Sequence, residues 1–154
     1  MKINSPRTKK LGELGEILVA QWLETEGWTI LHHRWRCRWG EIDLIAQKPT
    51  TLLFVEVKTR SRGNWDANGL LAITASKQRK LWQTAELFLA ENPNLANLNC
   101  QFDLALVKSK RQSPPLNSHL GDENLPRQIE FGQPLAYGGY LLTLDNYLPA
   151  ILEQ

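Results

Sequence analysis

Two short apolar runs joined by a turn, within Gly40–Arg60 (GEIDLIAQKPTTLLFVEVKTR), carry charged side chains inside segments that are typical of buried strands. Glu41 and Asp43 lie in the first run, and Glu56 and Lys58 lie in the second. Buried carboxylates are costly unless they are paired with a cation or bind a metal ion. Whatever fold this chain adopts must therefore supply a partner for these charges.

The size and composition of the chain predict one domain with a core of its own. The 154 residues are 42% hydrophobic and 22% charged, which is ordinary for a globular protein. No apolar run approaches the roughly 18 residues that a membrane span needs, and the first residues lack the apolar centre of a signal peptide. We therefore expect a cytoplasmic protein that does not bind a membrane.

Positive charge is concentrated in the first part of the chain. Residues 1–111 hold 17 Lys and Arg against 11 Asp and Glu, whereas residues 112–154 hold 1 against 5. A basic body is compatible with a phosphate-bearing partner, and equally with a solvated surface.

Hydrophobic periodicity and turn signals predict an α/β domain with a mixed sheet. The expected elements are a helix from Ser5–Pro6 to Gly27, strands at 28–38, 39–47 and 52–60, a helix at 74–90, strands at 100–107 and 137–144, and a short helix at 146–152. Residues 1–107 would form an α-β-β-β-α-β core, 108–136 a long mobile loop, and 137–154 a C-terminal appendage of the same domain. We expect Asp103 to close its strand, although it could also be a further acidic member of a site.

The register of the central hairpin follows from its turn. If residues 48–51 form a four-residue turn, Gln47 faces Leu52, and the same count places Asp43 opposite Glu56. Glu41 would then face Lys58. Two carboxylates at this separation repel each other, and Mg²⁺ would neutralise them through oxygen ligands. The alternative is a cluster of charges neutralised across the strands by Lys58.

Two groups of cations have more than one interpretation. Arg34, Arg36 and Arg38 alternate along one strand, as a row that either contacts phosphates or forms an exposed, solubilising face. Lys77 lies in the first turns of the second helix, where the helix dipole disfavours a cation unless an anion binds nearby. An ordinary solvated helix face explains Lys77 as well.

Three ordered motifs resemble the uncharacterised YraN-like bacterial family of the PD-(D/E)XK nuclease superfamily. They are Gly12-x-x-Gly15-Glu16, the run from Arg36 to Ile45 (RCRWGEIDLI), and the run from Phe54 to Arg60 (FVEVKTR). Ile42 precedes Asp43 where the superfamily name has proline, and the YraN-like pattern has that form. The resemblance covers about residues 8–107 and implies a restriction-endonuclease-like core, similar to that of Holliday-junction resolvases.

The resemblance also implies roles for individual residues. Asp43, Glu56 and the Val57 carbonyl would bind Mg²⁺, with Mn²⁺ as a possible substitute, and Lys58 would be the catalytic lysine. Glu16 would orient water or bind metal from the first helix.

Gln78 would reach the same site from the second helix, or would be a partly exposed helical glutamine. The nucleic-acid-binding residues would be Arg34, Arg36, Arg38, Arg60 and Lys77.

The implied activity is hydrolysis of phosphodiester bonds in DNA, with branched or damaged DNA as candidate substrates and a homodimer as a possible assembly. The alternatives are a nucleic-acid-binding module without turnover, and a protein-interaction module that docks through the acidic C-terminal segment.

Overall fold

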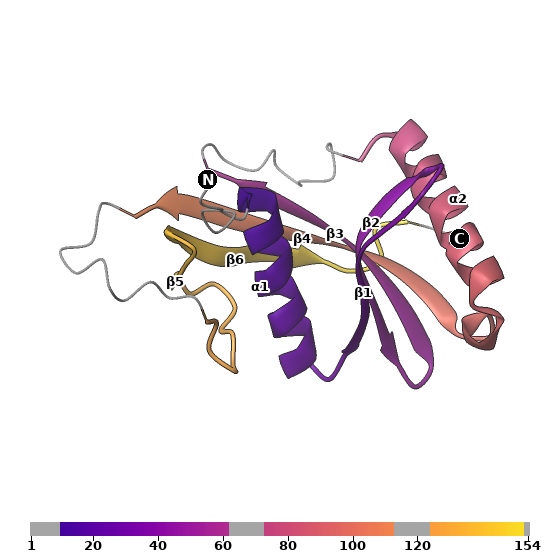
Figure 1. The fold of residues 1–154 in the computed structure, drawn as a ribbon, viewed down its shortest axis with the longest axis horizontal. Coiled ribbons are helices and arrows are strands. Elements are labelled where there is room, and N and C mark those ends of the chain that lie inside the picture. Colours follow the sequence, from indigo (N-terminus) through magenta and orange to yellow (C-terminus); the bar gives the residue numbers. More distant parts are fainter. Residues whose placement is uncertain (1–9, 62–72, 113–123, 153–154) are drawn as a thin grey trace, which may run out of the picture.

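The computed structural model describes residues 10–61, 73–112 and 124–152 (Figure 1). The elements are α1 (Leu11–Thr25), β1 (Thr29–Cys37), β2 (Gly40–Lys48), β3 (Thr51–Arg60), α2 (Ala75–Glu91), the short 3-10 helix η2 (Pro93–Leu95), β4 (Asn99–Arg111), β5 (Leu135–Tyr137) and β6 (Tyr140–Leu148). The expected helix start at Ser5–Pro6 lies outside the described residues. In the described part of the chain, no helix is long and apolar enough to cross a membrane.

The strands form one six-stranded sheet in the order β1-β2-β3-β4-β6-β5. Among the strands of the described residues, β3 and β4 pair in parallel, and the other neighbouring pairs are antiparallel. Parallel neighbours need a crossover connection, and α2 lies within that connection between β3 and β4. The predicted α/β class with a mixed central sheet, consistent with a restriction-endonuclease-like core, is confirmed.

The two faces of the sheet carry separate apolar cores. On β3, Leu53, Val55 and Val57 pack in the cluster that includes the buried residues of α1. Leu52 and Phe54 alternate with them and pack in the cluster that includes the buried residues of α2. The two helices therefore cover opposite faces, and β3 is buried between them, which explains why its sequence is apolar at every position from Leu52 to Val55.

The predicted register of the β2–β3 hairpin is confirmed. Gln47 pairs with Leu52, and Lys48 with Thr51, so the turn itself shrinks to Pro49 and Thr50. The same register continues as far as Leu44 and Val55.

The C-terminal part of the chain departs from the sequence prediction. Strand β4 continues through Arg111 instead of ending at residue 107, and it pairs with β6 along its second half. The helix expected at 146–152 is wrong, because the residues up to Leu148 continue β6 and the described residues that follow are not helical. Residues 113–123 of the expected loop lie outside the described part.

The prediction that Asp103 closes its strand is wrong. Asp103 lies buried within β4, which continues well beyond it. Its carboxylate accepts hydrogen bonds from the Tyr147 hydroxyl, from the Ala150 amide at 2.9 Å and from the Gln101 side chain at 2.8 Å. Burial and the charge of Asp103 raise the pKa of Tyr147, so the phenol stays protonated as a donor. Asp103 thereby fixes the end of the chain to the sheet.

Helix α1 meets β3 without a side chain between them at Gly15. A Cβ placed on Gly15 would come within 2.0 Å of the Thr59 hydroxyl oxygen and 3.3 Å of the Thr59 Cβ. The Thr59 hydroxyl is buried and has no hydrogen-bond partner within the described residues. Only glycine permits this approach, and the next residue on the helix is Glu16.

We predict that Gly15→Ala lowers the free energy of unfolding by about 2 kcal/mol, because overpacking at Thr59 outweighs the better helix propensity of alanine. Thr59→Ala removes the clashing oxygen, and the double variant should recover most of the loss. Chemical denaturation measures all three variants.

Gly12→Ala is the matched control, since a Cβ on Gly12 meets nothing within 4 Å. It should stabilise the protein by about 0.5–1 kcal/mol through helix propensity alone. Equal stability of the Gly12→Ala and Gly15→Ala variants would contradict the proposed contact.

Candidate metal centre

The β2–β3 ladder ends at Leu44 and Val55, and the two strands separate beyond that point. Asp43 and Glu56, which the sequence predicts to face each other, therefore do not form a ladder pair. Instead, the Val57 amide donates a hydrogen bond of 2.8 Å to Asp43 Oδ2. The carboxylate of Asp43 satisfies an amide that β2 would otherwise have bonded, and it stays buried where the strands separate.

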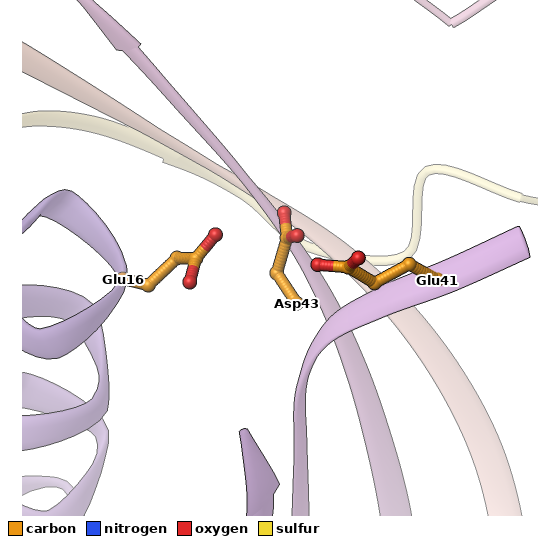
Figure 2. A group of neighbouring side chains, drawn as sticks. All are labelled: Glu16, Glu41 and Asp43. Carbon is orange, nitrogen blue, oxygen red and sulfur yellow. The ribbon is translucent and has the colours of Figure 1, made fainter. Parts of the chain in front are cut away.

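Three carboxylates converge at this point (Figure 2). Glu16 comes from α1, whereas Glu41 and Asp43 come from β2, and one oxygen from each lies within 4.8 Å of the other two. Glu16 and Asp43 are buried and Glu41 is partly exposed. Figure 2 shows Asp43 between the other two side chains, so the predicted approach of Glu16 from the first helix brings it to Asp43.

Glu41 is a member of this cluster that the sequence prediction misassigned. It was expected to face Lys58, but it forms an ion pair with Arg36, with 2.7 Å between Arg36 Nε and Glu41 Oε2. Its position two residues before Asp43 on the same strand was the available signal, because such residues share a side of the strand.

Glu56 and Lys58 lie together beside the cluster. Lys58 Nζ is 3.4 Å from Glu56 Oε1, and both side chains are mostly buried. Glu56 does not belong to the group of three, but its charge acts on Asp43. The sequence correctly grouped Lys58 with Glu56, and the Val57 carbonyl remains a predicted ligand.

Burial and repulsion both oppose ionisation of this cluster. Burial, followed by the charge of Glu56, raises the pKa of Asp43 to about 7, although the Val57 amide acts in the opposite direction. Burial also raises the pKa of Glu16, against the hydrogen bond from Arg34. These acids have the environment of groups that a cation would stabilise in their charged form.

The donor set fits a hard divalent cation. All three groups offer carboxylate oxygens, which Mg²⁺, Mn²⁺ and Ca²⁺ accept. Oxygens on opposite sides of a Mg²⁺ ion lie about 4.1 Å apart, and a Ca²⁺ ion places them about 5 Å apart. The three carboxylate oxygens lie within 4.8 Å of one another, so small side-chain movements would bring them to the separations that either ion needs.

Helix α2 brings a second cation to Lys58. Lys77, in the first turn of α2, contacts Lys58, and this contact, followed by burial, lowers the pKa of Lys77. Burial alone would lower the pKa of Lys58, but a hydrogen bond from Lys58 to the Lys77 amine, followed by the charge of Glu56, raises it. Two adjoining amines form a site that an anion would stabilise.

Gln78 is held at the start of its own helix. Its side-chain amide donates to the Ile73 carbonyl at 3.4 Å, and the side chain is partly buried. This contact is local, so a role for Gln78 in the site remains a prediction.

The row of arginines predicted on β1 is divided in the structure. Arg34 Nε is 2.7 Å from Glu16 Oε2, and Arg36 pairs with Glu41, so both guanidinium groups contact the acidic cluster. Arg38 lies in the β1–β2 turn, with its guanidinium carbon 4.8 Å from the ring centroid of the exposed Trp39. Arg60 ends β3 and is exposed.

Arg34 adopts a left-handed backbone conformation, with φ at 51°. This region costs a residue other than glycine roughly 1–2 kcal/mol. The register of β1 with β2 is the same on both sides of Arg34, so neither the ladder nor a periodic pattern in the sequence marks this left-handed residue.

The raised pKa of Asp43 predicts how stability depends on pH. The unfolded group titrates near pH 3.8 and the folded group near pH 7, so folding favours the protonated acid. The free energy of unfolding should fall as the pH rises from about 4 to about 7, by at most about 4 kcal/mol from this group. Asp43→Asn keeps an acceptor for the Val57 amide and should remove this component.

Urea denaturation in the presence of EDTA, repeated across this pH range, measures the difference between Asp43→Asn and the wild type. The difference should be near zero at about pH 4 and largest above about pH 7, in favour of the variant. Glu24→Gln, at an exposed position of α1, is the control. A difference that does not change with pH would contradict the assignment.

Comparison with known proteins places the chain in a family. Residues 15–107 match the family described as "Uncharacterised protein family UPF0102". A UPF0102 protein of Trichodesmium erythraeum is 48% identical over 153 residues, which cover 89% of this chain and 85% of the relative. The UPF0102 protein sll0189 of Synechocystis is 51% identical over 141 residues, which cover 90% and 94% of the two chains.

The match includes α1 from Gly15 onward and the strands that carry the acidic cluster. The chain belongs to the UPF0102 (YraN) family, which is placed in the PD-(D/E)XK superfamily.

Proposed function

We propose that this protein is a Mg²⁺-dependent endonuclease that hydrolyses phosphodiester bonds in DNA. The observation that carries the proposal is the convergence of Glu16, Glu41 and Asp43 where β2 and β3 separate, with Glu56 and Lys58 beside them. Family membership supports the fold of this site. Branched or damaged DNA is the candidate substrate.

The carboxylates would hold the cation. Asp43 and Glu56, with the Val57 carbonyl, form the proposed ligand set, and Glu16 and Glu41 extend it from α1 and β2. A bound divalent cation would polarise the phosphate and lower the pKa of a coordinated water.

The remaining groups have separate tasks. Lys58 has a raised pKa and is therefore charged at neutral pH, which suits it to stabilise negative charge that develops on the phosphate. Glu16, whose pKa is also raised, is suited to orient the attacking water and accept its proton.

The DNA backbone would be bound by cations around the cluster. Lys77 adjoins Lys58, and Arg34, Arg36, Arg38 and Arg60 lie on β1, in the β1–β2 turn and at the end of β3. A cytoplasmic location and a homodimer remain predictions.

Cleavage should depend on both carboxylate and lysine. We expect the protein to cut plasmid, single-stranded or four-way-junction DNA with Mg²⁺ or Mn²⁺. Asp43→Asn should abolish cutting, and Lys58→Ala should slow it by about 100-fold or more. Gel electrophoresis of labelled DNA measures the rates.

Lys110→Ala, an exposed lysine at the end of β4, is the control and should cut normally. If no substrate is cut, or if Asp43→Asn cuts as fast as the wild type, the enzymatic proposal is wrong. DNA binding that persists in both proteins without cleavage would then favour a binding module.

Phosphate contacts predict salt-dependent binding. In EDTA, DNA affinity should fall steeply between about 50 and 200 mM salt, and Lys77→Ala should reduce the logarithmic slope by about one. Fluorescence anisotropy with a labelled duplex and a labelled single strand measures both. Arg79→Ala, an exposed cation on the same helix, should change the slope less. An equal slope for Lys77→Ala and wild type would exclude Lys77 from the interface.

A further inference from the structure

Glu16, a member of the acidic cluster, forms an ion pair with Arg34. The Arg34 Nε to Glu16 Oε2 distance is 2.7 Å, the Glu16 side chain is 10% exposed and the Arg34 side chain is 30% exposed. A charge-assisted hydrogen bond of this length in a mostly buried place is a strong interaction. Arg34 is thus a counter-ion to a carboxylate of the proposed metal centre.

The backbone at Arg34 is strained where this contact is made. Arg34 and Ala150 are the residues other than glycine with positive φ in the described ranges. The β1–β2 ladder pairs His33 with Leu44 and Trp35 with Ile42, which places Arg34 opposite Asp43. The strained residue therefore lies beside the cluster, and its side chain reaches Glu16 on α1.

A divalent cation and Arg34 would compete for Glu16. Arg34 Nε is bonded to Oε2 of this carboxylate, a cation would need an oxygen of the same group, and the two positive charges would repel each other at this distance. A phosphodiester offers Arg34 another partner, because guanidinium groups bind phosphate oxygens with matching geometry. A phosphate that engages Arg34 would release Glu16 to the cation.

We propose that Arg34 is a positioning residue that couples cation binding at Glu16 to capture of a phosphodiester. This inference rests on the proposed function, and it adds a form of regulation to the same site. Without nucleic acid, Arg34 holds the affinity for the cation low. With nucleic acid, Arg34 turns to the phosphate and the affinity rises, and by linkage the cation strengthens phosphate binding equally.

Calorimetric titration of the full chain with Mn²⁺ tests the coupling. Without nucleic acid, Arg34→Gln should bind Mn²⁺ about tenfold more tightly than the wild type, because a competing charge-assisted hydrogen bond is gone. A single-stranded phosphorothioate oligonucleotide, which resists cleavage, should tighten Mn²⁺ binding to the wild type and should do so much less in Arg34→Gln. Arg34→Lys keeps the charge and should bind Mn²⁺ more weakly than Arg34→Gln.

Two further variants keep the test clear. Arg34→Gly accepts φ at 51° without strain and should bind Mn²⁺ as tightly as Arg34→Gln, even if glutamine disturbs β1. Arg36→Gln removes the matched pair with Glu41, whose side chains are 68% and 33% exposed, and should have a smaller effect.

The outcomes separate this inference from the proposed function. If Mn²⁺ binds in a manner that Asp43→Asn abolishes, but Arg34→Gln and Arg34→Gly bind it no more tightly than the wild type, the inference is overturned and the metal centre stands. An equal effect of the oligonucleotide in wild type and Arg34→Gln overturns it too. If Mn²⁺ binds neither the wild type nor Arg34→Gln, with or without the oligonucleotide, both proposals fail.

Discussion

The amide of Val57 is the group on which the geometry of the acidic cluster depends. The ladder between β2 and β3 begins at Leu44 and does not include the residues of β2 before it, so this amide has no ladder partner on that side, and Asp43 accepts its hydrogen bond. A buried amide without an acceptor is costly. Where the ladder ends, the buried Asp43 carboxylate supplies the acceptor that the Val57 amide would otherwise lack. The same separation of the strands leaves room for the other carboxylates.

Charge balance around the cluster comes from elements that are far apart in the sequence. Helix α1 contributes Glu16, β1 contributes the arginines that pair with Glu16 and Glu41, and β3 contributes Glu56 with Lys58. The Arg34–Glu16 and Lys58–Glu56 pairs are mostly buried and depend on the packing that holds their elements in place, whereas the Arg36–Glu41 pair is more exposed. The site is therefore a product of the tertiary fold, and the hairpin alone would not reproduce it.

Local sequence signals predicted the parts of the structure that local rules control. The period of α1, the turn that sets the hairpin register, and the α-β-β-β-α-β order all follow from side-chain pattern and turn chemistry. The point where the β2–β3 ladder stops does not, because there the Val57 amide bonds to the Asp43 side chain, and no pattern in the sequence marks that exchange. The predicted pairing of Glu41 with Lys58 is wrong for that reason, and Glu41 pairs with Arg36.

The failures near the C-terminus have a similar cause. Asp103 looks like the end of a strand in isolation, but its partners Tyr147 and Ala150 lie 44 and 47 residues later. The residues after Leu144 continue β6 because they pair with residues 104–106 of β4, and this pairing overrides their local preference. Arg34 is a third case, since nothing in an alternating pattern marks a left-handed residue.

The contact between Gly15 and Thr59 would have a consequence for selectivity among metal ions at the proposed centre. It sets how closely α1 lies to β3, and Glu16 follows Gly15 directly on that helix. The spacing between Glu16 and the carboxylates of β2, and hence the ionic radius that the proposed metal centre would accommodate best, therefore depends on a residue that offers no ligand. Redesign of this centre for a larger ion would begin at the helix–strand spacing, with every carboxylate left unchanged.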